Sequence, residues 1–171
     1  MSDKTLLLVD FQNEWVDKSS DYYVGDITEV IKRANKLIEF CRGNGFKIIF
    51  TRHIEEDSEG PFKEGTPSSE LIADLYRETS DIIITKKRIS PFFRTDLEAR
   101  LKGTKEVVIA GILTNLCVRS AVQDAYDRDF EITVIKECCV SFDKQTQEFT
   151  FKDLESTREE IKFLDLEEFL K

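Results

Sequence analysis

The stretch VVIAGILTNLCVRSAV, residues 107–122, joins two hydrophobic patterns without a break. Its first part, up to Gly111, is a continuous run of β-branched and small apolar residues, which is typical of a strand covered on both faces. Beyond a polar Thr-Asn pair, apolar residues recur at 118, 121, 122 and 125, the spacing of one helix face. The stretch therefore predicts a strand that leads directly into a helix, with Cys117 at the junction.

Six apolar runs of this kind are distributed along the chain. Helical periods lie between them, the longest from Val30 to Cys41, where Gly43 and Gly45 can end the helix. Apolar pairs at 97 and 101 and at 149 and 154 indicate shorter helices. The alternation predicts an α/β fold, a three-layer α/β/α sandwich around a mainly parallel, Rossmann-like sheet of roughly six strands. The expected strands are TLLLVD (5–10), FKIIFTR (46–52), DIIIT (81–85), EVVIAG (106–111), EITVIK (131–136) and, more weakly, EIKFL (160–164).

The chain of 171 residues has the length of one ordinary domain, which we expect to span residues 1–171. No internal repeat, low-complexity tract or linker interrupts it. The segment EEDSEGPFKEGTPSSE, residues 55–70, combines many charges with Gly and Pro turn signals, and this predicts a long surface loop. Such a loop could serve as a lid or as an oligomer contact.

Composition narrows the class of protein and of ligand. Apolar residues make up 40% and charged residues 35%, which is typical of a soluble globular protein. The net charge is 25 − 34 = −9 and the acidic residues are scattered, so nucleic acid and anionic membranes are disfavoured as partners and a small molecule is favoured. The N-terminal apolar run ends at Asp10, and no run approaches the roughly 20 residues of a membrane span, so we expect a cytoplasmic protein.

The four cysteines are expected to be reduced, and their positions, 41, 117, 138 and 139, match no zinc pattern. Cys41 lies on the apolar face of its helix and is expected in the core. Cys138 and Cys139 are expected to be packing residues at the end of a strand. We therefore expect thiol chemistry at most, with no metal and no cofactor.

Polar and reactive residues follow each of the first four expected strands. In open α/β sheets, ligands bind outside the carboxyl ends of the strands, so these residues form one candidate list. An acid, a base and a thiol converge on that edge. The residues are Asp10, Phe11, Gln12 and Asn13 after the first strand, Arg52 and His53 after the second, Lys86, Lys87 and Arg88 after the third, and Thr114–Cys117 after the fourth.

The position of Cys117 favours a reactive thiol. If Asn115 caps the helix, Cys117 lies in the first turn, where free N–H groups and the helix dipole favour the thiolate. The cation of Lys86 would lower the thiol pKa further below its usual value of about 8.5, and N–H groups of the turn could bind an oxyanion. The alternatives are a small core cysteine, an Asp10 that only caps a turn, and a Lys86 that belongs to a solvated charge run.

Three motifs in order resemble the isochorismatase-like cysteine hydrolase superfamily, over nearly the whole chain. They are D-F-Q-N-E-W at 10–15, K-K-R-I-S-P-F-F-R-T-D-L at 86–97 and A-G-I-L-T-N-L-C-V at 110–118. The resemblance implies a catalytic triad of Asp10, Lys86 and Cys117. It also implies a cis peptide bond between Ile112 and Leu113, with the N–H groups of Leu113 and Cys117 as the oxyanion hole.

The implied reaction is hydrolysis of an amide or carbamoyl C–N bond through a thioester on Cys117. Motif position and side-chain type together make Gln12, Asn13, Trp15 and Phe92 the substrate-binding candidates, although Trp15 and Phe92 fit a core equally well. The resemblance also implies a homo-oligomer, a dimer or larger, with pockets near the interface.

Two departures from better-known members limit the substrate. Nicotinamidases of the superfamily carry a D-x-H-x-x-x-H metal cluster after the second strand, whereas this chain has RHIEEDSEG there and His53 as its single histidine. Pro91 replaces the small residue usual in S-A-F and could reshape the pocket wall. Three alternatives stay open: vinyl-ether hydrolysis with Asp10 as the acid, a Cys117–His53 dyad, and an inactive homologue that only binds a ligand.

Overall fold

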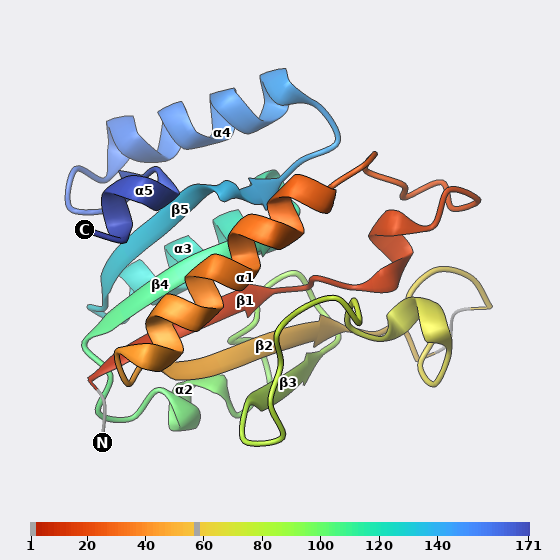
Figure 1. Ribbon diagram of the computed structural model, residues 1–171, viewed down its shortest axis with the longest axis horizontal. Helices are drawn as coiled ribbons and strands as arrows, with labels where there is room; N and C mark the ends of the chain where they lie inside the picture. Colours follow the sequence, from red (N-terminus) through yellow and green to blue (C-terminus); the bar gives the residue numbers. More distant parts are fainter. Residues whose placement is uncertain (1–2, 57–58) are drawn as a thin grey trace.

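The computed structural model describes residues 3–56 and 59–171. Its core is one sheet of six parallel strands in the order β3-β2-β1-β4-β5-β6 (Figure 1). The predicted parallel, Rossmann-like sheet is therefore confirmed, and its strand order is the one in which dinucleotide-binding folds are built. The strands are β1 (Lys4–Val9), β2 (Lys47–His53), β3 (Ile82–Lys86), β4 (Glu106–Ile112), β5 (Glu131–Val140) and β6 (Lys162–Leu164).

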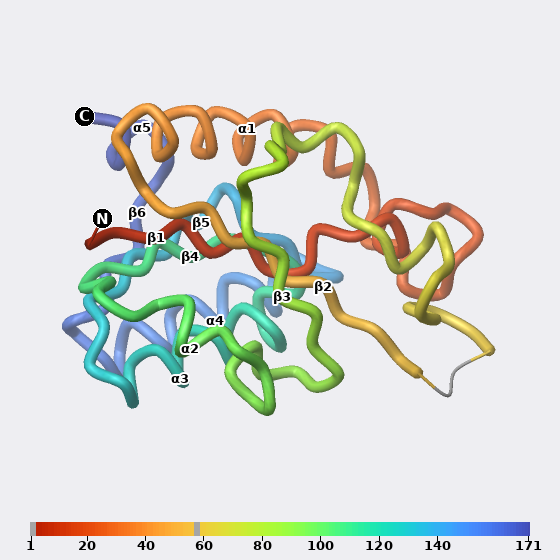
Figure 2. The backbone as a smooth tube through the Cα atoms, turned by 90° about the horizontal axis from the view of Figure 1, so that it is seen from below, coloured from red at the N-terminus to blue at the C-terminus, as the bar shows by residue number. Residues whose placement is uncertain are grey.

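Helices cover both faces of the sheet, as predicted. In the view along the sheet, α1 and α5 lie on one side, and α2, α3 and α4 lie on the other (Figure 2). Each connection between parallel strands crosses over through one of these layers. The helices are α1 (Thr28–Gly43), α2 (Leu97–Arg100), α3 (Arg119–Tyr126), α4 (Lys144–Thr157) and α5 (Leu166–Phe169), and the short helical turns are η1 (Asn13–Val16), η2 (Pro67–Ser69) and η3 (Thr114–Val118).

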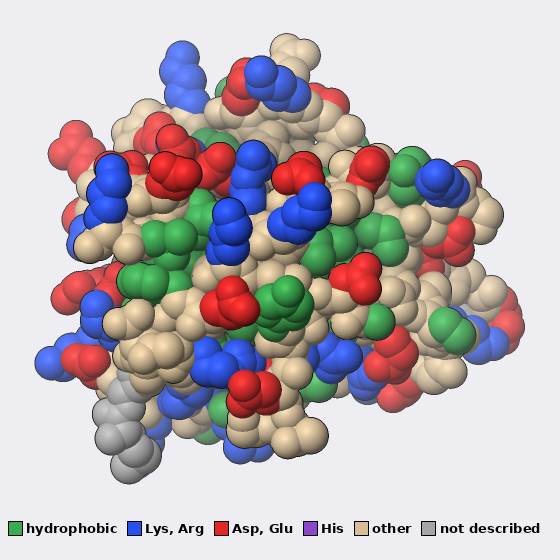
Figure 3. All heavy atoms as spheres, in the orientation of Figure 1, with side chains coloured by type: hydrophobic (Ala, Val, Ile, Leu, Met, Phe, Trp, Pro, Cys, Tyr) green, Lys and Arg blue, Asp and Glu red, His purple; other side chains and the backbone are tan. Residues whose placement is uncertain are grey.

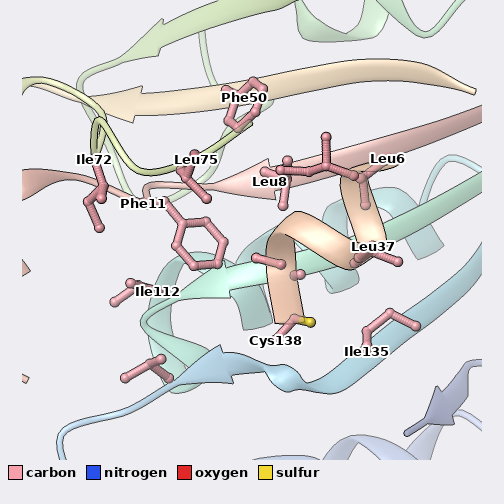
Figure 4. Packing of buried hydrophobic residues seen from close by; sticks show 14 of the residues in the cluster. Leu6, Leu8, Phe11, Leu37, Phe50, Ile72, Leu75, Ile112, Ile135 and Cys138 are labelled. Atoms are coloured by element: carbon pink, nitrogen blue, oxygen red, sulfur yellow. The ribbon is translucent and has the colours of Figure 1, made fainter. Parts of the chain in front are cut away.

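Each face of the sheet has its own hydrophobic core. Leu6 and Leu8 of β1 lie on the same side as Leu37 of α1, and Figure 4 shows them together with Phe11. Leu7 and Val9 alternate to the opposite core, which α2, α3 and α4 cover. Strands buried on both faces give continuous apolar runs, which explains the sequence pattern.

The three structural cysteines are buried as predicted. Cys41 and Cys138 belong to the core under α1, and Cys139 belongs to the opposite core. The helix predicted from the apolar pair at 149 and 154 is present as α4, but one of the two residues does not lie on its apolar face. Phe149 is 66% exposed. Leu154 lies on that face as expected, and Phe151 takes the place of Phe149.

The outer surface of the layer that contains α1 carries acidic and basic side chains interspersed with one another (Figure 3). Surface pairs such as Lys32 with Glu29 and Arg33 with Glu137 belong to this pattern. Among the described residues, no helix has the length and apolar character needed to cross a bilayer.

The order of strands reverses between β1 and β4, which lie side by side at the centre of the sheet. Gly111 of β4 makes this pairing possible at its carboxyl end. A Cβ atom there would lie 2.3 Å from the Val9 carbonyl oxygen, and the glycine has a φ of +153°. Because only glycine fits, the segments after β1 and β4 begin close to each other, at the place where such sheets bind ligands.

Candidate active site

Asp10, Lys86 and Cys117 meet at the carboxyl ends of β1, β3 and β4. The Lys86 Nζ atom lies 2.7 Å from Asp10 Oδ2 and donates a hydrogen bond of 3.4 Å to Cys117 Sγ. It also donates to the backbone carbonyl of Arg88 at 3.0 Å. The Asp10 and Lys86 side chains have no exposed surface, whereas Cys117 is partly exposed. The structure thus brings together the three residues that the motifs select.

Asp10 is held from several directions. Its backbone has a φ of 52°, a left-handed conformation that aspartate tolerates better than most residues. The Thr51 hydroxyl donates a 2.6 Å hydrogen bond to Asp10 Oδ1, and the Asp10 amide donates to the Thr51 carbonyl and hydroxyl oxygens. Thr51 was missed by sequence reasoning, although a polar residue within the apolar run of β2 was a signal. Its bonds leave Oδ2 of Asp10 directed to Lys86.

The segment that follows Lys86 is tied to the helix that follows Cys117. The Ser90 hydroxyl accepts hydrogen bonds from the amides of Phe92 and Phe93 and donates to the Asp124 carboxylate of α3. The backbone carbonyl of Arg88, two residues before Ser90, accepts a hydrogen bond from Lys86 Nζ. The turn that contains Ser90 therefore also helps to hold the Lys86 ammonium group in place. Neither Ser90 nor Asp124 was assigned a role from the sequence, because the serine entered only as part of the second motif and the aspartate lies outside all three motifs.

Cys117 lies in η3, a single turn with π-helical hydrogen bonding. The predicted cis peptide bond between Ile112 and Leu113 is present at the start of this turn. The amides of Leu116 and Val118 both donate a hydrogen bond to the Leu113 carbonyl oxygen at 3.1 Å. In the sequence, the Cys117 amide lies between these two donors. The prediction that Asn115 caps the helix is wrong, because Leu113 occupies the cap position and Asn115 Oδ1 instead accepts a bond from Ser141.

The motifs, the fold and the three-residue contact point to one superfamily, and a comparison of whole sequences decides it. The family model for the Isochorismatase domain matches residues 4–162 of the chain. The chain belongs to the isochorismatase family.

Relatives and solved structures agree with that assignment. A probable inactive nicotinamidase of Arabidopsis thaliana is 30% identical over 152 residues, which cover 77% of this chain and 78% of that protein. Maleamate amidohydrolase of Pseudomonas putida is 23% identical over 167 residues, covering 88% and 78%. The crystal structure of an isochorismatase-like hydrolase from Alkaliphilus metalliredigens is 24% identical, with a TM-score of 0.88 over 99% of this chain and 98% of that one. The protein is therefore a cysteine hydrolase of the isochorismatase family.

The electrostatics of this isochorismatase-family site differ from the sequence-based expectation. Burial, followed by the neighbouring Asp10 carboxylate, raises the pKa of the Cys117 thiol to about 12, because together they outweigh the lowering by Lys86. Burial lowers the pKa of Lys86, but the charge of Asp10, the interaction with Cys117 and the hydrogen bonds to both together outweigh it, so the pKa is raised overall. The site therefore holds a neutral thiol beside an ion pair. This corrects the expectation that the resting Cys117 is a thiolate.

We expect Cys117 to react slowly with iodoacetamide near pH 7 and faster as the pH rises, because only the thiolate is alkylated and its pKa is raised. Peptide mass spectrometry at several pH values measures this rate for each cysteine. The buried Cys41, Cys138 and Cys139 should stay unlabelled in the folded protein, and all four should react in the unfolded chain. Rapid labelling of Cys117 at pH 7 that does not change up to pH 9 would contradict the raised pKa.

Gln12, one of the four substrate-binding candidates, makes its hydrogen bonds inside the protein. Its side chain is fully buried. The Nε2 atom donates to the carbonyls of His53 and Ser69, and the Oε1 atom accepts from the His53 amide. Asn13 makes similar contacts, since Nδ2 donates to the Pro67 carbonyl. Both residues fasten the loop between 55 and 70 to the end of β1.

Trp15 and Phe92 are also packing residues rather than exposed pocket walls, at 5% and 7% exposure. Trp15 packs against Phe62 and donates its indole N–H to the Asp10 carbonyl at 2.8 Å, so it positions the aspartate. Phe92 lies in the core under α3. The next residue, Phe93, is 48% exposed and lines a cavity.

His53 lies beside Lys86 in the register of β2 and β3 but does not join the thiol. Its ring packs against Phe62, and its Nε2 atom lies 3.5 Å from Glu55. Burial, followed by the charge of Lys86, lowers the pKa of His53, so the imidazole is neutral at pH 7. Among the described residues the thiol instead contacts Lys86 and Asp10.

A cavity of about 730 Å³ opens beside Lys86, at the carboxyl ends of β2 and β3. Residues 54–56 and 85–88 line it, together with Phe93 and Arg94. Within residues 3–56 and 59–171, no group of three or more His, Cys, Asp or Glu side chains is arranged to hold a metal ion.

Proposed function

We propose that the protein hydrolyses the C–N bond of a small amide or carbamoyl compound through a thioester on Cys117. The observation that supports this most directly is the contact of a partly exposed thiol with a buried carboxylate–ammonium pair. A carboxylate can take the proton of the thiol, and an ammonium can stabilise the sulfur as it gains charge. The three groups therefore supply a base, a cation and a nucleophile, with the cation of Lys86 within hydrogen-bond distance of the other two.

Acylation begins when Asp10 takes the proton of Cys117 as the sulfur attacks the acyl carbon. A carbon–sulfur bond forms, and the acyl oxygen becomes an oxyanion, for which the N–H groups of Leu113 and Cys117 are the proposed donors. Asp10 then gives its proton to the leaving nitrogen, the C–N bond breaks and ammonia or an amine departs. Lys86 stays protonated throughout, because Asp10 and the sulfur face it.

Deacylation uses the same carboxylate. Asp10 takes a proton from water, whose oxygen attacks the thioester carbon, and the carbon–sulfur bond then breaks. The sulfur recovers the proton from Asp10, and the product leaves as a carboxylic or carbamic acid. The raised pKa of Cys117 suits this scheme, because the proton moves only when the acyl group is in place and the resting thiol stays unreactive.

Relatives support amide chemistry and also supply an alternative. Maleamate amidohydrolase of Pseudomonas putida acts on an amide by its name. The relative from Arabidopsis thaliana is described as a probable inactive nicotinamidase, and this description favours ligand binding without turnover as the second candidate function. The contacts of Asp10, Lys86 and Cys117 favour the hydrolase.

Hydroxylamine trapping tests the proposal. The protein is incubated with a panel of small primary amides, and ammonia release is measured with and without hydroxylamine. A thioester predicts that hydroxylamine diverts the acyl group to a hydroxamate and that the acylated Cys117 peptide appears by mass spectrometry after rapid acid quench. Ammonia release without hydroxamate or acyl-enzyme would contradict the thioester, and tight ligand binding without any turnover would select the second candidate.

A further inference from the structure

The segment that follows β2 buries a phenylalanine in an unfavourable backbone conformation. Phe62 has a φ of 56°, in the left-handed region that bulky side chains rarely adopt, and its side chain is only 5% exposed. Its carbonyl accepts a hydrogen bond of 2.9 Å from the Glu55 amide, and Glu55 pairs with Lys63 in an isolated β-bridge. A residue keeps such a conformation only where the surrounding contacts hold it, and residues of this kind cluster at functional sites.

The contacts that hold Phe62 are made by its ring. Measured between centroids, this ring lies 4.9 Å from Trp15, 5.8 Å from Tyr22 and 5.4 Å from His53. Trp15 and Tyr22 also contact each other, with their ring centroids 6.1 Å apart. Phe62 therefore packs both against the segment after β1 and against the end of β2.

Trp15 connects this aromatic cluster to Asp10. The indole N–H of Trp15 donates a buried hydrogen bond of 2.8 Å to the Asp10 carbonyl oxygen. Asp10 has a φ of 52°, so its backbone also depends on the contacts around it. The direction of the Asp10 side chain follows from this backbone, because the backbone angles decide where Cβ points. Two left-handed residues that are far apart in the sequence, Asp10 and Phe62, are thus joined through an indole ring.

We infer that Phe62 is a positioning residue, which holds Trp15 against the Asp10 carbonyl and so keeps the Asp10 carboxylate in place beside the ammonium and the thiol. The alternative is a residue that only packs, since Phe62 belongs to the core under α1. The hydrogen bond from Trp15 to Asp10 favours positioning, because loss of the Phe62 ring leaves the indole free to move. The inference rests on the proposed function in one respect, because Asp10 is the proposed base.

The reactivity of Cys117 reports the position of the Asp10 carboxylate without any turnover. Asp10 raises the pKa of the thiol, so displacement of the carboxylate lowers that pKa and speeds up alkylation. We expect Phe62→Ala to raise the rate of iodoacetamide labelling of Cys117 at pH 7 at least about threefold. Trp15→Phe keeps a ring but removes the indole donor, and it should act in the same direction. Phe151→Ala removes a similarly buried ring from the opposite core and should leave the rate unchanged.

A second background separates positioning from simple exposure of the thiol. In Asp10→Asn the carboxylate is absent, so Phe62→Ala should change the pKa of Cys117 much less than it does in the wild type. An equal change in both backgrounds would overturn the inference, because Phe62 would then act on the burial of the thiol rather than through Asp10. An unchanged labelling rate in both Phe62→Ala and Trp15→Phe would overturn it as well. Trp15→Phe decides the matter where Phe62→Ala does not fold.

Kinetics provide a readout that depends on the proposed function. With the best substrate of the amide panel, Phe62→Ala should lower kcat at least about tenfold and change KM less than about threefold, because the base is displaced while the thiol remains. If no amide is hydrolysed but the labelling results are as expected, the hydrolase proposal fails and the positioning role stands. If Phe62→Ala lowers only the unfolding temperature, with labelling and kcat as in the wild type, Phe62 is a packing residue and the inference is overturned.

Discussion

Replacing Cys117 by alanine is expected to lower kcat for amide hydrolysis by at least about 10⁴-fold, because no other group in the site can form the thioester. The fold should be retained, since the side chain is partly exposed and small. Steady-state ammonia release on the best amide substrate measures the loss, and circular dichroism with a thermal scan checks the fold.

Cys41→Ala is the matched control, because it removes an equally small thiol from the core under α1. It should cost about 1–2 kcal/mol of the free energy of unfolding and leave kcat nearly unchanged. Equal loss of activity in the two variants would show that Cys117 has no special part in the reaction. Full ammonia release in Cys117→Ala would contradict the thioester. Vinyl-ether hydrolysis, in which Asp10 alone acts as the acid, predicts instead that no amide is cleaved and that turnover of a vinyl ether survives this substitution.

Removing one member of the Asp10–Lys86 pair is expected to reduce stability as well as activity. Both side chains lack exposed surface, so Asp10→Asn leaves the Lys86 ammonium buried without a counter-charge. Breaking a buried ion pair in this way costs about 3–5 kcal/mol. Lys86→Met in turn leaves the Asp10 carboxylate buried without a counter-charge. Unfolding in urea, with linear extrapolation to water, measures each change in the free energy of unfolding.

The double variant Asp10→Asn with Lys86→Met separates the two effects. It removes both buried charges, so most of the lost stability should return, while kcat should stay at least about 10³-fold below that of the wild type. A cycle made from the two single variants and the double variant gives the coupling energy of the pair. Additive losses of stability would contradict direct coupling, and activity restored in the double variant would contradict the role of Asp10 as the base.

The sheet and its layers could be predicted because strands buried on both faces leave continuous apolar runs, as in β1 and β4. The meeting of Asp10, Lys86 and Cys117 could be predicted because the carboxyl ends of parallel strands lie at one edge, and the family motifs then selected Lys86 rather than Lys87. These inferences depend on chain direction and periodicity. Both properties can be read directly from the linear sequence.

The hydrogen bonds that hold the site residues in place could not be predicted in the same way. The bond from Thr51 to Asp10 and the bond from Ser90 to Asp124 join residues 41 and 34 positions apart, and no periodic pattern marks such pairs. The pKa of Cys117 depends on how deeply the thiol is buried, which only packing decides. The contacts of Gln12 could not be foreseen for a similar reason, because its side-chain amide bonds to backbone groups of distant segments.

The place of β1 in the middle of the sheet has a consequence for synthesis of the chain. One neighbour, β2, follows β1 after a single helix, but the other, β4, begins only at Glu106. At roughly 5–20 residues per second, a ribosome needs on the order of 5–20 s to pass from Val9 to that point. Until then the backbone amides and carbonyls on one side of an apolar strand have no partner, which is the arrangement that promotes aggregation. Nascent chains and truncated fragments that end before Glu106 are therefore the forms of this protein that most need a chaperone.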